Sequence, residues 1–198
     1  MNLIEIFSSW DKQRDKPKVA PTLDNILKEI YLHGSDQGPW VAGGMGRQLA
    51  IGEVDFADID VWFNNQFQYN ELRERLSHTF GYEMYETYSS DNAITYQVGK
   101  FKVQLIKRAF YASLDSVFRD FDFTCCQVAV DRDLKVYGPG IEDARRRVLR
   151  LNRLDEKAFL ARYAKYVGYG YVMAPDEFIR IIENQKLNYE FDGSVLGY

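Results

Sequence analysis

The feature that most constrains this 198-residue chain is a short apolar segment that runs into two adjacent glycines. Residues 40–42 (WVA) have the apolar character of a buried strand, and Gly43-Gly44 interrupts them. Residues 45–51 follow as a short predicted helix that Gly52 closes, and a second predicted strand covers 59–63. The order of strand, glycine pair, helix and strand predicts an α/β fold.

The Gly43-Gly44 loop has the composition of a phosphate-binding turn. Glycine lets a phosphate approach the backbone closely, and the N–H groups at the start of a helix favour anions. Arg47, three residues after Gly44, can add a charge-assisted hydrogen bond to the same phosphate. The alternatives are an ordinary turn and a solvated arginine on a helix surface.

The second predicted strand carries an Asp58-Ile59-Asp60 sequence. Alternate residues of a strand share a face, so the two carboxylates stand side by side, about 7 Å apart at the backbone. Such a pair suits hard divalent cations, and two of these ions can bridge phosphates and activate an attacking hydroxyl. The alternative is a pair of exposed strand residues. Because Gly43-Gly44, Arg47 and the aspartates follow one another closely, we favour a phosphoryl-transfer site.

The composition narrows the class of protein. The chain is 46% hydrophobic, which favours a folded core. Its net charge of −4 argues against a protein whose whole surface binds nucleic acid. Cys125 and Cys126 are adjacent and lack metal-site or redox spacing, so we expect buried, reduced thiols. The sequence shows no apolar run of the ~20 residues that a membrane span needs, so we expect a cytoplasmic protein without a membrane partner.

The remaining hydrophobic pattern predicts one main domain with a short appendage. We expect an N-terminal arm at 1–20, a head domain at 21–150 and a short helical extension at 151–198. The main elements expected beyond the glycine loop are a helix that opens at Thr22 and stops at Gly34, a helix through Leu72, Leu76 and Phe80, a hairpin of strands 93–98 and 101–106, a helix at 114–118, a strand at 123–130, and helices at 141–149, 156–167 and 176–184.

Several of these segments together resemble a known family. Residues 41–49 (VAGGMGRQL) and 58–61 (DIDV) look like the head domain of class II CCA-adding enzymes and bacterial poly(A) polymerases. Residues 122–131 (DFTCCQVAVD), 140–150 and 162–169 are similar to three further segments of that family, in the same order. The resemblance implies a Pol β-like nucleotidyltransferase fold, α/β (α+β) in class. In it, helices flank a mixed sheet and a short helical C-terminal extension follows.

The family's activity implies transfer of a nucleoside monophosphate from an NTP to an acceptor hydroxyl, with release of pyrophosphate. The resemblance makes Asp58 and Asp60 the catalytic ligands of Mg²⁺ or Mn²⁺. It favours ATP or CTP as the nucleotide, and an RNA 3′ end or a protein as the acceptor. The residues that it assigns to the nucleotide are Gly43, Gly44, Arg47, Asp122, Thr124 and Arg150.

The sequence also departs from the family. Gln104 stands where this fold often has a third carboxylate, and the family's base-reading acidic and arginine residues are missing at 152–156. Gln48 replaces an acidic residue, and Asp120-Phe121 replaces two arginines. The family's tRNA-holding body and tail domains find no match here. An alternative is therefore a catalytically impaired nucleotide-binding or regulatory protein of the same fold, and a third is an interaction protein that keeps only the fold.

Two further clusters of residues each allow two interpretations. Arg145-Arg146-Arg147 and Arg150 suit either the C-terminal end of a helix, where cations offset the dipole, or contact with phosphate. The many tyrosines between 82 and 171 can stack on bases, although packing in the core or on the surface is their commoner use.

Overall fold

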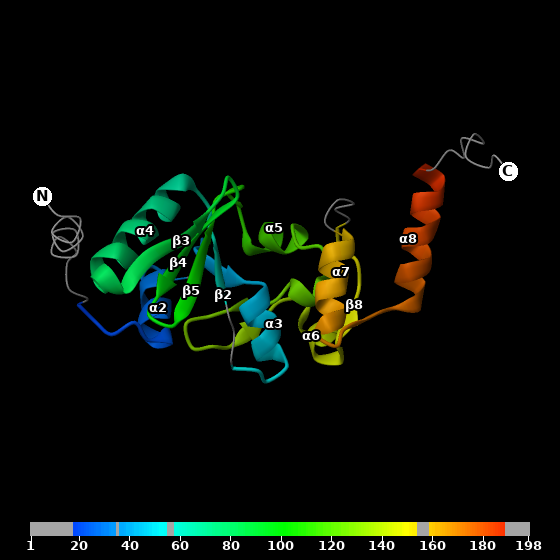
Figure 1. Cartoon of the computed structure of the whole chain (residues 1–198), viewed down its shortest axis with the longest axis horizontal. Helices are drawn as coiled ribbons and strands as arrows, with labels where there is room; N and C mark the ends of the chain where they lie inside the picture. Colours follow the sequence, from blue (N-terminus) through cyan, green and yellow to red (C-terminus); the bar gives the residue numbers. More distant parts are fainter. Residues whose placement is uncertain (1–17, 35, 55–57, 154–158, 189–198) are drawn as a thin grey trace, which may run out of the picture.

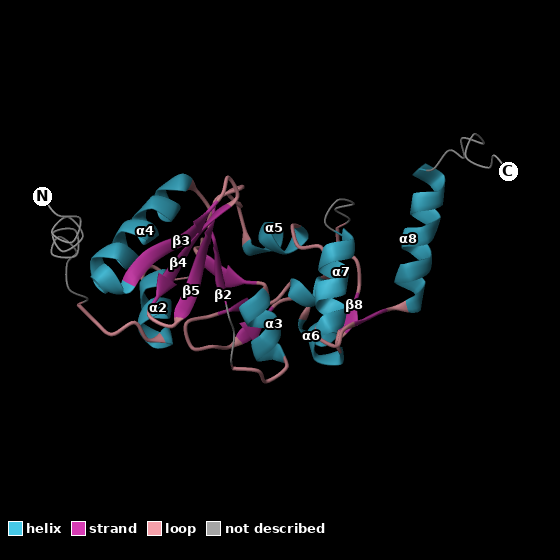
Figure 2. Ribbon diagram, in the orientation of Figure 1, coloured by secondary structure: helices cyan, strands magenta, loops and turns pink. Residues whose placement is uncertain are grey.

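The computed structural model describes residues 18–34, 36–54, 58–153 and 159–188 (Figure 1). The predicted arm at 1–20 therefore lies almost wholly outside the described residues. Helices flank a central mixed sheet, and the last two described helices lie at one end of it (Figure 2). None of the described helices combines the length and apolar character that crossing a membrane requires.

The central sheet contains seven of the described strands, in the order β3-β4-β5-β2-β1-β6-β7. The strands β2 and β5 are parallel, and every other neighbouring pair of this sheet is antiparallel. The sheet is therefore mixed, as the sequence predicted. Its strands are β1 (Trp40–Ala42), β2 (Asp58–Trp62), β3 (Met84–Ser89), β4 (Ala93–Val98), β5 (Phe101–Ile106), β6 (Ala129–Val130) and β7 (Val136–Tyr137).

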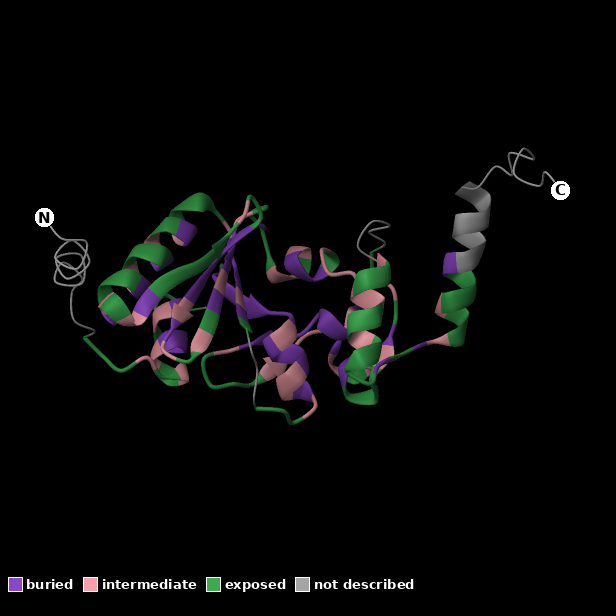
Figure 3. Cartoon of the chain, in the orientation of Figure 1, coloured by how far each residue is buried: buried purple, intermediate pink, exposed green. Residues whose placement is uncertain are grey.

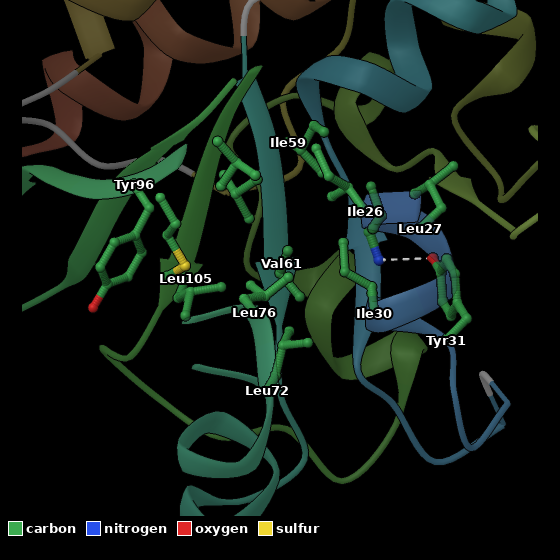
Figure 4. Close-up of a cluster of buried hydrophobic side chains, with 14 of the residues drawn as sticks. Ile26, Leu27, Ile30, Tyr31, Ile59, Val61, Leu72, Leu76, Tyr96 and Leu105 are labelled. Atoms are coloured by element: carbon green, nitrogen blue, oxygen red, sulfur yellow. Dashed lines mark hydrogen bonds between the residues drawn. The ribbon is translucent and has the colours of Figure 1, made fainter. Parts of the chain in front are cut away.

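Two helices cover one face of the sheet, α2 (Leu23–Ile30) and α4 (Gln66–Phe80). The helix α2 begins where predicted, because the Thr22 hydroxyl accepts a hydrogen bond from the Asn25 N–H at 3.2 Å. Figure 4 shows apolar side chains of both helices packed against β2 and β5. The labelled members of this cluster are Ile26, Leu27, Ile30, Tyr31, Ile59, Val61, Leu72, Leu76, Tyr96 and Leu105.

The opposite face of the sheet carries less helix and leaves room for a site. The short helix α5 (Leu114–Arg119) lies on this side. The helix α3 (Gly44–Ala50) instead contributes Met45 to the core under α2 and α4. Near α5, a smaller cluster buries Trp40, Trp62 and Phe118. Because Ile59 and Val61 point into the core under α2 and α4, Asp58 and Asp60 point to this second face.

The C-terminal part packs on a third cluster of buried residues. It contains α6 (Ile141–Arg146), β8 (Val148–Leu149), α7 (Phe159–Gly168), β9 (Val172–Met173) and α8 (Pro175–Asn188). The strands β8 and β9 form a separate parallel pair. The residues of α7 and the first part of α8, up to Arg180, are largely exposed (Figure 3).

Two predicted elements are wrong in part. The predicted strand at 123–130 is a short 3-10 helix, η2 (Thr124–Cys126), and only Ala129–Val130 is a strand. The backbone around Gly140 packs so closely on this segment that a Cβ on Gly140 would lie 1.9 Å from the Thr124 carbonyl oxygen. The apolar residues before β6 are instead buried against Ala144, Leu149 and Tyr171 of the C-terminal elements.

The predicted helix at 141–149 ends three residues early. Arg147 adopts the left-handed conformation (φ 54°, ψ 43°), which stops α6 after Arg146. The next two residues form β8, in which Val148 pairs with Val172. The prediction failed because the partner strand lies more than twenty residues further along the chain.

Candidate active site

A cavity of about 270 Å³ lies where α3, β2 and α7 meet. It brings together five of the eight site residues that the sequence predicted: Gly43, Gly44, Arg47, Asp58 and Asp60. The other lining residues are Gln48, Glu53, Phe121, Cys126, Arg147, Lys165, Tyr166 and Tyr169. We call this cavity the nucleotide pocket.

The glycine loop forms one wall of the nucleotide pocket. Gly43 has φ 107°, a conformation that side chains disfavour, and a Cβ there would lie 3.2 Å from the Phe121 ring and 3.5 Å from Asp60 Oδ2. At Gly44 a Cβ would meet no heavy atom within 4 Å, so the backbone at that residue is open to a ligand. At residue 43 any other side chain would be strained, so glycine is required there. At residue 44 the absence of a side chain leaves the backbone accessible.

The carboxylates of Asp58 and Asp60 stand on one face of β2. Neither carboxylate forms an ion pair with any residue that the structure describes. Burial, and to a smaller extent the charge of Asp58, raise the pKa of Asp60 to about 7, and Lys165 opposes both effects. Two neighbouring carboxylates without a paired cation form a local excess of negative charge.

The chemistry of this pair suits a Mg²⁺ ion that a substrate phosphate would share. Proteins commonly hold Mg²⁺ with one or two carboxylates, and phosphate oxygens and waters complete the coordination. Gln104 lies opposite Asp60 in the parallel register of β2 and β5, and its amide donates to Thr95 Oγ1 at 3.0 Å. Among the described residues, no group of three or more His, Cys, Asp or Glu side chains is placed to hold a metal ion.

Arg47 is the cation of the nucleotide pocket that is held most tightly. It is only 6% exposed, and its guanidinium carbon lies 5.1–5.5 Å from the ring centres of Tyr166, Tyr169 and Tyr171. One guanidinium nitrogen donates to the Tyr171 hydroxyl at 3.5 Å, whereas Nε has no hydrogen-bond partner. A buried guanidinium without a carboxylate leaves a positive charge that a bound anion would compensate.

Two further cations line the nucleotide pocket from the C-terminal elements. Lys165 projects from α7 and forms no ion pair with the described residues. Arg147 is held by the Tyr169 carbonyl at 2.6 Å and by Glu53 at 3.3 Å. The sequence singled out Arg147 only as part of a basic cluster and gave no signal for Lys165, because its position depends on how α7 packs.

The other three predicted site residues do not line the nucleotide pocket. Asp122 forms an ion pair with Arg162, and the Thr124 hydroxyl donates to Asp143 at 2.5 Å. Arg150 lies 3.5 Å from the same Asp143. Their assignment to the nucleotide remains a prediction.

The two cysteines are free and buried, as predicted. They lie on η2 with their sulfur atoms 3.9 Å apart, and not on opposite faces of a strand. Cys126 also reaches the nucleotide pocket, where its sulfur lies 2.8 Å from the Tyr166 hydroxyl.

The described part of the chain has a Pol β-like nucleotidyltransferase fold. Solved structures agree on the fold. A CCA-adding enzyme of Bacillus stearothermophilus in complex with CTP superposes with a TM-score of 0.61 at 20% identity, over 83% of this chain and 43% of that one. A tRNA-processing enzyme gives a TM-score of 0.61 at 19% identity, over 87% of this chain and 49% of that one.

The sequence identifies the family more narrowly. The family model described as Gabija anti-defense 2 family protein matches residues 13–140, and the chain belongs to that family. A relative from Bacillus phage SPbetaL7, named Gabija anti-defense 2, is 26% identical over 149 residues. The match covers 72% of this chain and 36% of the relative, so the chain spans about a third of that protein's length.

Proposed function

We propose that this protein transfers a nucleoside monophosphate from an NTP to an acceptor hydroxyl and releases pyrophosphate. The observation that carries the proposal is the buried Arg47 guanidinium, which has no carboxylate partner and faces the same cavity as Asp58 and Asp60. A triphosphate would supply the anion that Arg47 lacks, beside the carboxylates that suit a divalent cation.

Each part of the nucleotide pocket has a role in this proposal. Arg47 and Lys165 would bind the triphosphate, and the open backbone at Gly44 would let it approach closely. Asp58 and Asp60 would hold Mg²⁺ or Mn²⁺, which when bound neutralises phosphate charge and orients the reacting oxygens. The exposed ring of Tyr169 at the same pocket is suited to stacking on the base. ATP and CTP are the nucleotides that we favour. The solved structure of the Bacillus stearothermophilus CCA-adding enzyme contains CTP.

A direct test combines binding with turnover. We expect Mg²⁺·ATP or Mg²⁺·CTP to bind the wild-type protein in a calorimetric titration, and labelled NTP to release pyrophosphate when an acceptor is present. Asp58→Ala and Asp60→Ala should abolish release, and Arg47→Gln should weaken binding about tenfold or more, or roughly 1.4 kcal/mol. A matched control is Arg146→Gln, because Arg146 is exposed and lies outside the nucleotide pocket. Equal NTP binding by Arg47→Gln and wild type would contradict the proposal.

A second candidate is a nucleotide-binding protein without catalysis. Gln104 favours it, because the amide stands opposite Asp60 and cannot neutralise a divalent cation as a carboxylate would. This candidate predicts the same NTP affinity without release of pyrophosphate. Either activity would serve the anti-defense role for which the family is named, and we infer that role for this chain from its family.

A further inference from the structure

A second cavity, of about 320 Å³, lies on the other side of Asp60. Asp60 and Phe121 line both cavities, so a group bound in the second one would meet a nucleotide at Asp60. We call it the acceptor groove. Its remaining lining residues are Trp62, Tyr88, Ser90, Asn92, Ala93, Gln104, Ile106, Arg108, Asp120 and Arg162.

A row of paired residues crosses four strands at the acceptor groove, and three of its four members line the groove. Asp60 on β2 pairs with Gln104 on β5, Gln104 with Thr95 on β4, and Thr95 with Tyr88 on β3. Directly paired residues share a face, so this row leads from the carboxylate to Tyr88, which is 59% exposed. Three strand spacings separate the two ends, or about 14 Å.

The charges of the acceptor groove differ from those of the nucleotide pocket. Both arginines of the groove are already paired, Arg108 with Asp120 and Arg162 with Asp122. In the nucleotide pocket, by contrast, Arg47 and Lys165 form no ion pair with the described residues. A nucleic-acid strand brings one phosphate per nucleotide and binds where cations are free to receive it. The polar side chains of the groove are otherwise uncharged: Ser90, Asn92 and Gln104. Gln104 already donates to Thr95, and the Ser90 hydroxyl bonds to the Ala93 backbone in its own turn.

We propose that the acceptor groove binds a protein segment and that the acceptor is the hydroxyl of a Ser, Thr or Tyr side chain. This inference rests on the proposed nucleotidyl transfer. The hydroxyl oxygen would bond to the α-phosphorus as the bond from that phosphorus to the β-phosphate oxygen breaks. Pyrophosphate leaves with the electron pair, and the hydroxyl proton passes to solvent. Amide and hydroxyl side chains suit this occupant because they can pair with peptide N–H and C=O groups.

The length of this row of residues determines which position of the bound segment contacts Tyr88. An extended peptide advances about 3.3 Å per residue, so about four residues separate a hydroxyl at Asp60 from a side chain that rests on Tyr88. We therefore expect a preference for an apolar or aromatic side chain at that separation from the modified residue.

The test offers the intact protein two kinds of acceptor with Mg²⁺ and labelled ATP or CTP. One is a set of peptides of about ten residues, each with one central Ser, Thr or Tyr and randomised flanks. The other is single-stranded RNA and DNA oligonucleotides with free 3′ hydroxyls. We expect label on the peptides. Tyr88→Ala should raise the peptide KM about fivefold or more and leave acceptor-independent NTP binding unchanged, since one stacked side chain contributes about 1 kcal/mol.

Tyr82→Ala is the matched control, because Tyr82 is 45% exposed and lines neither cavity. Label on oligonucleotide 3′ ends and not on peptides would overturn the inference. So would a peptide KM that Tyr88→Ala leaves equal to that of Tyr82→Ala. If pyrophosphate is released with neither acceptor labelled, the acceptor inference fails and the proposed function stands. If no NTP binds at all, both fail.

Discussion

At the scale of single residues, Asp60 shows how a candidate catalytic site lowers the stability of the free protein. Burial and the neighbouring Asp58 raise the pKa of Asp60 to about 7, against an ordinary value of about 3.9. Between these values the folded state binds a proton that the unfolded state has released. The free energy of unfolding therefore falls as the pH rises from about 4 to about 7.

We predict that Asp60→Asn stabilises the metal-free protein above pH 7 while it removes activity. Three pKa units correspond to at most about 4 kcal/mol, and the gain should vanish near pH 4, where the wild-type carboxyl is protonated. Urea unfolding in EDTA at pH 4 and pH 8 measures both values. Asp91→Asn, in the exposed turn before β4, is the control and should change neither. An Asp60→Asn protein no more stable than wild type at pH 8 would contradict the argument.

The sequence predicted only part of the nucleotide pocket, for a physical reason. Gly43, Arg47 and Asp60 belong to one stretch of strand, loop, helix and strand, so local spacing was enough to group them. Lys165 on α7 and Tyr169 directly after that helix reach the same cavity, more than one hundred residues later. Their position depends on tertiary packing, which no local pattern encodes.

At the scale of elements, the hairpin and the helix α4 were predictable because their hydrophobic periods are local. The strands β4 and β5 pair around Gly99-Lys100 as expected. The segment at 123–130 has the apolar content of a buried strand, but only Ala129–Val130 pairs in the sheet, and the apolar residues from Phe123 to Val128 are buried against the C-terminal elements. The apolar composition of this segment therefore predicted the wrong element, because a buried loop and a buried strand contain similar residues.

The helix α3 carries two glycines that should respond to the same substitution in opposite ways. A Cβ on Gly46 would lie 2.3 Å from the Val128 carbonyl oxygen, so α3 or the backbone at Val128 must move. We expect Gly46→Ala to lower the unfolding free energy by about 1–3 kcal/mol. A Cβ on Gly44 meets no neighbour, so Gly44→Ala should leave stability unchanged or slightly higher.

Gly44→Ala should instead weaken the binding of Mg²⁺·ATP, because its methyl group would stand where we place the triphosphate. We expect a loss of about tenfold, or roughly 1.4 kcal/mol, by calorimetric titration. Thermal unfolding of both variants gives the comparison. Unchanged affinity in Gly44→Ala would mean that the phosphate does not approach the backbone there.

At the scale of the whole molecule, the third buried cluster joins the C-terminal elements to the head. It combines Phe123 and Leu149 with Tyr171, Met173 and Ile181. Tyr171 also lies over Arg47, so the same packing that holds the C-terminal elements positions a cation of the nucleotide pocket. We infer that the described elements α7, β9 and the start of α8 fold together with the head, and that α7 contributes to the site.

Tyr171→Ala tests this inference across the molecule. Tyr171 is 1% exposed, and its hydroxyl donates to the Ala144 carbonyl at 3.3 Å, so truncation should cost about 3–5 kcal/mol. If the parts fold as one unit, urea unfolding followed by tryptophan fluorescence should shift by that amount, because Trp40 and Trp62 are buried in the sheet. Phe178→Ala on α8, which is 51% exposed, is the matched control and should change little. A fluorescence transition equal to that of wild type would mean that the C-terminal elements unfold separately, and Arg47 would then need another support.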